Sequence, residues 1–259
     1  MKGIDISNWQ RDISDYSKLK SDGVEFAILK ITEGTSFTDK AFTQHYNALR
    51  QQGIQVGAYV FSHAKDAAEA VAEAKFALSV LDGKTLDFPL FPDCESNDML
   101  QYGNKVLLTA LAFGKVVQQA GYKWGVYANR SWWNHYLDVG TVSDAAGVVW
   151  VAEYGVAVCK ISTADIWQYS DQGRISGYGS NVDMNVIMDG WFIDRGHPVV
   201  NIEDEKESGV IQTETKPTFD KKVLRLQLDM SADGQWDEPF DGLATDKFIS
   251  ALKAWLPIE

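Results

Sequence analysis

Short apolar runs alternate with amphipathic stretches over the first two thirds of the chain. Three stretches carry apolar residues at helical spacing, and a glycine follows each where a helix is expected to end: 41–52, 66–81 and 107–120. Eight apolar runs have the length of strands: 3–6, 26–31, 56–61, 88–95, 124–128, 148–153, 164–169 and 182–187. Strands that alternate with helices predict a parallel α/β sheet, and eight of them predict a closed barrel. After residue 121 the spacing is too short for a helix between all the strands, so we expect helices to be missing on one side.

The pattern changes near residue 195, which predicts a barrel over residues 1–195. Residues 196–218 are charged and poor in large apolar side chains, which predicts an acidic linker. Residues 219–259 contain one alternating run and one stretch of helical periodicity, which predicts a small C-terminal module. About 40 residues is near the lower limit for independent folding, so we expect this module to need a partner surface.

Charge and the chain start narrow the function classes. The chain has 24 Lys+Arg against 36 Asp+Glu, a net charge of −12, which argues against binding to nucleic acid or to an anionic membrane. No secretory signal pattern and no run of 18 apolar residues is visible, so we expect a protein made in the cytoplasm.

Metal and disulfide chemistry have little support in the sequence. Cys94 and Cys159 are too few for a disulfide framework, and the four histidines lack the spacing of metal ligands. No phosphate-binding or dinucleotide-binding glycine motif occurs. We therefore expect two buried cysteines, no metal and no cofactor.

Carboxylates stand at the ends of several predicted strands. They are Asp5, Glu33, Asp93, Glu95 and Asp183. Chemistry in an α/β barrel gathers at the carboxyl ends of its strands, so these acids are the candidate site.

The triplet Asp93-Cys94-Glu95 is the most informative of these positions. Strand side chains alternate, so Asp93 and Glu95 are expected on one face, about 6.6 Å apart along the backbone. A close pair of carboxyls is what glycoside hydrolysis uses, although two solvated acids in a strand-end loop would give the same pattern. Aromatic residues at the predicted strand ends favour a carbohydrate substrate, because sugar rings stack on aromatic faces. They are Trp9, Tyr59, Tyr127, Trp150, Tyr154, Trp167 and Tyr169.

The ordered motifs together resemble glycoside hydrolase family 25, the Chalaropsis-type lysozymes or muramidases. Asp5-Ile6-Ser7-Asn8-Trp9-Gln10 is similar to the family's opening motif, and Asp93-Cys94-Glu95 to its Asp-x-Glu. The resemblance extends over about residues 2–193. Further motifs match at 27–34, 57–59, 127–129, 150–152, 167–169 and 182–185.

The resemblance implies a flattened, irregular TIM-like (β/α)5(β)3 barrel and cleavage of the β-1,4 bond between N-acetylmuramic acid and N-acetylglucosamine in peptidoglycan. It implies Glu95 as the general acid and Asp93 as its partner, with Asp5 and Asp183 as the other two acids. Groove residues that bind substrate are expected at Tyr59, Lys30, Glu33, Tyr127, Trp150 and Gln168. Asp93 would act either as a direct nucleophile or as the stabiliser of a substrate-assisted step.

Rival interpretations remain open for the barrel and for its tail. A glycan-binding barrel without catalysis would keep the aromatic residues, and a chitinase-like hydrolase would need a longer acidic signature than 93–95. The module over 219–259 would bind the cell wall or self-associate. The resemblance points to a phage or prophage endolysin, which would be made in the host cytoplasm and reach the wall after release.

Overall fold

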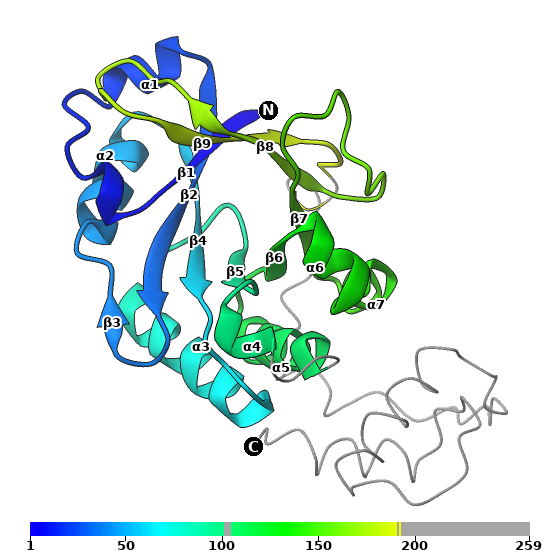
Figure 1. The fold of residues 1–259 in the computed structure, drawn as a ribbon. Helices are drawn as coiled ribbons and strands as arrows, with labels where there is room; N and C mark the ends of the chain where they lie inside the picture. Colours follow the sequence, from blue (N-terminus) through cyan, green and yellow to red (C-terminus); the bar gives the residue numbers. More distant parts are fainter. Residues whose placement is uncertain (101–104, 191, 193–259) are drawn as a thin grey trace, which may run out of the picture. The chain divides into compact units, whose positions relative to one another are not determined.

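The computed structural model describes residues 1–100, 105–190 and 192 (Figure 1). The predicted acidic linker over 196–218 and the predicted module over 219–259 lie outside these residues, and so does the predicted boundary near 195. Within the described residues, none of the helices combines the length and apolarity that crossing a membrane needs.

Eight strands close into a barrel, as the apolar runs predict. Neighbours around the barrel pair in the order β1-β9-β8-β7-β6-β5-β4-β2, and β1 also pairs with β2, which closes the ring. All pairs are parallel except those of β9 with β8 and with β1. The strands are β1 (Lys2–Ile6), β2 (Val24–Glu33), β4 (Gln55–Phe61), β5 (Leu90–Asp93), β6 (Gly125–Asn129), β7 (Val148–Ala152), β8 (Ile166–Gly173) and β9 (Val182–Ile187). A short strand, β3 (Phe37–Thr38), pairs with β2 outside the ring.

Helices follow the first five barrel strands, and the last three strands have none between them. Figure 1 shows α3, α5, α6 and α7 on the outside of the strands. The helices are α1 (Ser17–Ser21), α2 (Phe42–Gln51), α3 (Ala67–Leu81), α4 (Asn97–Leu100), α5 (Lys105–Gln119), α6 (Arg130–His135) and α7 (Val139–Asp144), with a 3-10 turn η1 (Asn8–Gln10). Residues 153–165, all described, contain no helix, which confirms the expected (β/α)5(β)3 arrangement.

The interior of the barrel is filled by large side chains. The core cluster is Phe26, Ile28, Phe88, Phe91, Tyr127, Val148, Trp150, Ala152, Ile166 and Phe192. Two glycines make room for it. A Cβ on Gly3 would lie 2.3 Å from the ring of Phe26, and one on Gly125 would lie 2.4 Å from that of Phe91. The barrel is therefore a packed core, and chemistry is confined to its rim.

Two local predictions need correction. The strand predicted at 88–95 is shorter, because β5 ends at Asp93 and Glu95 lies in the segment that follows it. Strand alternation therefore positions Asp93 but not Glu95. The helices α1, α4, α6 and α7 lie outside the predicted helical stretches, because their four to six residues are too few to show a helical period. Cys94 and Cys159 are buried and free, as expected.

Candidate active site

The predicted acids gather at the carboxyl end of the parallel strands. Asp5 lies near the end of β1 and Asp93 is the last residue of β5. Because β9 runs antiparallel to β1, its beginning meets the end of β1, and Asp183 lies directly opposite Asp5 in the register. The structure thus brings together acids that are 88 to 178 residues apart in the sequence.

Asp5 and Asp183 form a close pair in which burial favours the protonated form of both carboxyls. Asp5 Oδ2 accepts hydrogen bonds from Gln168 Nε2 and Asn185 Nδ2, each at 2.8 Å. Burial, and then the charge of Asp183, raises the pKa of Asp5 to about 8. Burial also raises the pKa of Asp183, while its hydrogen bond with Asp5 opposes that rise. At neutral pH Asp5 is therefore protonated and donates to Asp183.

Asp93 and Glu95 form a second pair with few partners. Asp93 is 6% exposed, and its Oδ1 is fully buried without a hydrogen-bond partner among the described residues. Burial, and then the charge of Glu95, raises the pKa of Asp93 well above its usual value. Glu95 is half-buried, and its Oε2 accepts one hydrogen bond, from Asn129 Nδ2 at 3.3 Å. Burial raises the pKa of Glu95 as well, so this pair holds a proton more tightly than ordinary carboxyls do.

Amide and hydroxyl groups hold the Asp5–Asp183 pair in place. Gln168 of β8 donates to Asp5 and accepts at Oε1 from the hydroxyls of Tyr127, at 3.0 Å, and Tyr154. Asn185 of β9 donates to Asp5 and accepts at Oδ1 from Trp150 Nε1 at 2.8 Å. Each amide therefore has a fixed orientation, because its oxygen and its nitrogen face different partners.

Trp150 lies in the core beside these acids. It is 1% exposed, and its ring meets those of Tyr127 and Tyr59 edge-on, with centroids 4.5 and 6.5 Å away. As placed, its indole supports Asn185 and offers no open face on which a sugar could stack. Its predicted role in substrate binding stays a prediction. Trp9, in contrast, is 83% exposed on the turn that follows β1.

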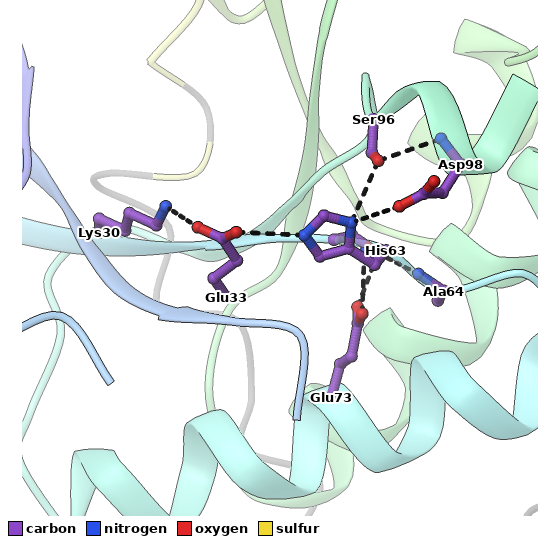
Figure 2. Close-up of polar contacts among 8 residues, drawn as sticks. Lys30, Glu33, His63, Ala64, Glu73, Ser96 and Asp98 are labelled. Atoms are coloured by element: carbon purple, nitrogen blue, oxygen red, sulfur yellow. Dashed lines mark hydrogen bonds and ion pairs between the residues drawn. The ribbon is translucent and has the colours of Figure 1, made fainter. Parts of the chain in front are cut away.

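A chain of charged groups crosses the rim from β2 to the segment after β5. Lys30 Nζ donates to Glu33 Oε2 at 2.5 Å and lies 5.0 Å from the ring centroid of Phe61. Glu33 Oε1 in turn lies 3.2 Å from His63 Nε2 (Figure 2). The Lys30 hydrogen bond, more than that of His63, holds the pKa of Glu33 below its usual value, so Glu33 is ionised.

Three polar residues at the site are not among the residues predicted from the sequence. Asn129 and Asn185 stand inside motifs that it used, but neither was assigned a contact. His63 was counted only among scattered histidines, although it stands just beyond the end of β4. The same strand-end argument that selected the acids would have found it. Among the described residues, no group of three or more His, Cys, Asp and Glu side chains could hold a metal ion.

Comparisons with known proteins agree with this arrangement. Residues 4–178 match the family described as "Glycosyl hydrolases family 25". Lysozyme M1 of Streptomyces globisporus is 32% identical over 71% of this chain and 67% of its own length. The autolytic lysozyme of Clostridium acetobutylicum is 29% identical over 73% of this chain and 56% of its own length. The match therefore spans only part of these relatives.

A solved structure with a similar fold also comes from a protein that is similar in sequence. The crystal structure of the CTP1L endolysin superposes with a TM-score of 0.64 at 31% identity, and covers 73% of this chain and 66% of its own. The family match over residues 4–178 includes Asp5, Asp93 and Gln168. The chain belongs to family 25 of the glycosyl hydrolases.

Proposed function

We propose that this glycoside hydrolase cleaves the β-1,4 bond between N-acetylmuramic acid and N-acetylglucosamine in peptidoglycan. One observation carries the proposal. At the rim of a family 25 barrel, a half-buried Glu95 stands beside Asp93, whose buried Oδ1 has no hydrogen-bond partner among the described residues. A buried polar atom without a hydrogen bond costs stability, so such an atom is retained where a ligand supplies the missing contact. The lysozymes among the relatives support a peptidoglycan substrate.

Glu95 is the proposed general acid. Its raised pKa keeps its proton at mildly acidic pH, where an ordinary glutamic acid would have lost it. Asn129 donates to Oε2, and no described residue donates to Oε1, so Oε1 is the oxygen proposed to carry the proton. Glu95 gives that proton to the glycosidic oxygen as the bond to the sugar C1 breaks.

Asp93 is the proposed stabiliser of a substrate-assisted step. The carbonyl oxygen of the 2-acetamido group attacks C1, and a bicyclic oxazolinium ion forms as the leaving sugar departs. Asp93 Oδ1 accepts the hydrogen bond of the acetamido N–H and faces the positive charge that develops there. Water then attacks C1, its proton returns to Glu95, and the acetamido group is restored. A buried carboxyl with a raised pKa suits this acceptor role better than that of a nucleophile.

The Asp5–Asp183 pair is proposed to position the sugar side of the site. A proton on Asp5 reduces the negative charge near Asp93. An ionised Asp5 would raise the pKa of Asp93 further. Lys30 acts in the same direction, because its charge lowers the pKa of Asp93. Both groups therefore limit the rise in the pKa of Asp93, which helps Asp93 to ionise when substrate is bound.

Digestion of purified peptidoglycan tests the proposal, with identification of the sugar at each new reducing end. We expect muramic acid ends, and no new ends from the Glu95→Gln variant at matched folding. Glucosamine ends would show a different bond specificity and overturn the muramidase assignment. Digestion of chitin in preference to peptidoglycan would favour a chitinase-like enzyme. Binding to walls without any new ends would favour a glycan-binding barrel.

We also propose that the chain serves as a phage or prophage endolysin, made in the host cytoplasm and released to the wall. The similarity to the CTP1L endolysin supports this. Expression inside bacteria tests it. We expect cells to stay intact until a membrane-permeabilising protein is induced, and then to lyse. Lysis without permeabilisation, abolished by Glu95→Gln, would contradict the need for release.

A further inference from the structure

His63 lies between two carboxylates that belong to different parts of the rim. Its ring stands just beyond the end of β4, with Glu33 of β2 on one side and Asp98 of α4 on the other (Figure 2). Nε2 lies 3.2 Å from Glu33 Oε1, and Nδ1 lies 2.9 Å from Asp98 Oδ2. Ser96 Oγ is 3.2 Å from the same Nδ1.

This arrangement requires a charged imidazole. Ionised carboxylates only accept hydrogen bonds, and a neutral imidazole has one N–H to donate, so it serves one of the two partners. The imidazolium serves both. Partial burial opposes the charge, but the hydrogen bonds to Glu33 and Asp98 outweigh it and raise the pKa of His63.

The charged groups around the ring come from three elements besides its own. Glu33 on β2 is paired with Lys30, Asp98 lies on α4, and the carboxyl of Glu73 on α3 accepts from the backbone N–H of His63 at 2.8 Å. Burial raises the pKa of Glu73, and the nearby His63 charge opposes that rise. The surroundings are thus mainly acidic, which favours the protonated ring.

One side of this contact is held by backbone hydrogen bonds, and the other side belongs to the segment that carries Glu95. The backbone of His63 is tied to Glu73, and the preceding Ser62 N–H donates to the Asp93 carbonyl at 3.1 Å. On the other side, Ser96 Oγ accepts from the Asp98 N–H at 3.3 Å and the Ser96 carbonyl from the Met99 N–H at 3.0 Å. The ring therefore links β4 to the turn at 96–99, next to Glu95.

We propose that protonated His63 is a positioning residue, which holds the segment 95–100 through Asp98 and Ser96 so that Glu95 faces the scissile bond. This inference rests on the proposed hydrolysis of peptidoglycan. Among the described residues, the side chain of Glu95 makes a direct hydrogen bond only with Asn129, at 3.3 Å. Its placement consequently depends on the backbone that His63 ties down.

The hydrolysis rate should depend on the protonation of His63, with a defined direction. Below its pKa, His63 is charged and holds both carboxylates. As the pH rises through that pKa, it loses one donor and the link to 96–98 weakens. The rate then falls toward the rate of a variant that lacks the link. Because Glu95 titrates equally in both proteins, the ratio of the two rates isolates His63.

The test compares wild type with His63→Gln on soluble peptidoglycan strands between pH 4 and 9. We expect kcat about tenfold lower in the variant at pH 5, with KM changed less than about twofold. The ratio of wild-type to variant kcat should approach one at high pH, with its midpoint at the His63 pKa that NMR measures. Asp98→Asn should lower that pKa and move the midpoint to lower pH. The exposed His135 supplies a control, and His135→Gln should give a ratio near one throughout.

A ratio that stays constant with pH would overturn the proposal, because a purely structural role gives that result. Amide hydrogen exchange supplies a readout that does not need activity. We expect the Asp98 and Met99 amides to lose protection in His63→Gln, after correction for intrinsic exchange. If wild type digests nothing, the proposed function fails, and unchanged protection in the variant would then refute the positioning role separately.

Discussion

The two pairs of carboxyls at the rim of the barrel carry the same kind of acidic group in different surroundings. Asp5 and Asp183 sit opposite each other on paired strands, and Asp5 receives hydrogen bonds from Gln168 and Asn185. Within the described part of the chain, Asp93 has one oxygen without a hydrogen-bond partner. Glu95 lies beyond the end of β5 and accepts one long hydrogen bond from a described residue. Asp5 therefore has its hydrogen-bond donors without substrate, whereas Asp93 Oδ1 has none among the described residues.

This difference separates support from chemistry. Burial raises the pKa in both pairs, so a shifted pKa does not by itself distinguish them. The two pairs differ in how many of their oxygens already accept a hydrogen bond from the protein. A carboxyl whose partners are fixed by the fold changes little during a reaction, while one that lacks a partner is free to accept the substrate. Substitutions in the two pairs should consequently have effects of different size and kind.

The largest effect is expected at Glu95. Glu95→Gln keeps the size of the side chain but removes the proton donor, so peptidoglycan cleavage should fall about 10²- to 10⁴-fold. Initial rates on purified walls measure this, with thermal unfolding as the check on folding. Glu25→Gln, at an exposed acid near the start of β2, provides the control and should keep full activity. Equal losses in both variants would remove Glu95 from the mechanism.

Asp93→Asn comes second and should change stability in the opposite direction from activity. The amide retains an acceptor oxygen but no negative charge, so kcat should fall about 10²- to 10³-fold. A carboxyl whose pKa is raised in the folded state destabilises the fold at pH values at which the unfolded chain has lost that proton. The variant should therefore unfold at a higher temperature than wild type at pH 8. Steady-state rates and thermal melts measure the two effects. A less stable variant at pH 8 would show that Asp93 carries a structural role.

Asp5→Asn should alter mainly the pH dependence of stability. Between pH 4 and 8 the folded state keeps the Asp5 proton and the unfolded state has lost it, so the free energy of unfolding of wild type falls as the pH rises. Each proton contributes at most about 1.4 kcal/mol per pH unit. An asparagine accepts from Gln168 and Asn185 and donates to Asp183 at every pH, so its curve should be flatter. Urea unfolding at several pH values measures the slopes, and parallel curves would show that Asp5 ionises normally.

The smallest effect is expected at Trp150. Trp150→Phe removes the hydrogen bond to Asn185 and should cost about 1–3 kcal/mol of unfolding free energy. Activity should drop a few-fold, because Asn185 then orients Asp5 less well. Trp133→Phe is the matched control, since Trp133 Nε1 donates to the Trp150 carbonyl at 3.2 Å away from the acids. Similar stability losses with activity lost only in Trp150→Phe would support the comparison, and intact activity in both would refute it.

The sequence predicts the long elements well and the short ones poorly. The apolar runs of β1, β4, β6 and β7 mark strands because buried parallel strands are almost continuously hydrophobic. The closure of the ring follows from their number. Helices α6 and α7 have six residues each, which is too short for a periodic signal. Their stability comes from an asparagine or aspartate cap and from packing.

The site follows a similar division. Acids at strand ends are predictable, because parallel strands deliver their carboxyl ends to one rim. The sequence does not predict which acid receives hydrogen bonds from the protein. The donors to Asp5 lie 163 and 180 residues away, and only the register of the strands aligns them. The place of Glu95 beyond the strand, and the link from His63 to Asp98, depend on loop geometry that has no period to detect.

A substrate with a good leaving group tests most directly whether Glu95 protonates the leaving group while Asp93 acts on the sugar side. The measurement is the rate of Glu95→Gln and Asp93→Asn on a dinitrophenyl β-glycoside of an N-acetylated sugar, whose phenolate leaves without a proton. We expect Glu95→Gln to come within about tenfold of wild type and Asp93→Asn to remain about 100-fold slower. Recovery of Asp93→Asn with Glu95→Gln still inactive would contradict the assignment of the two roles.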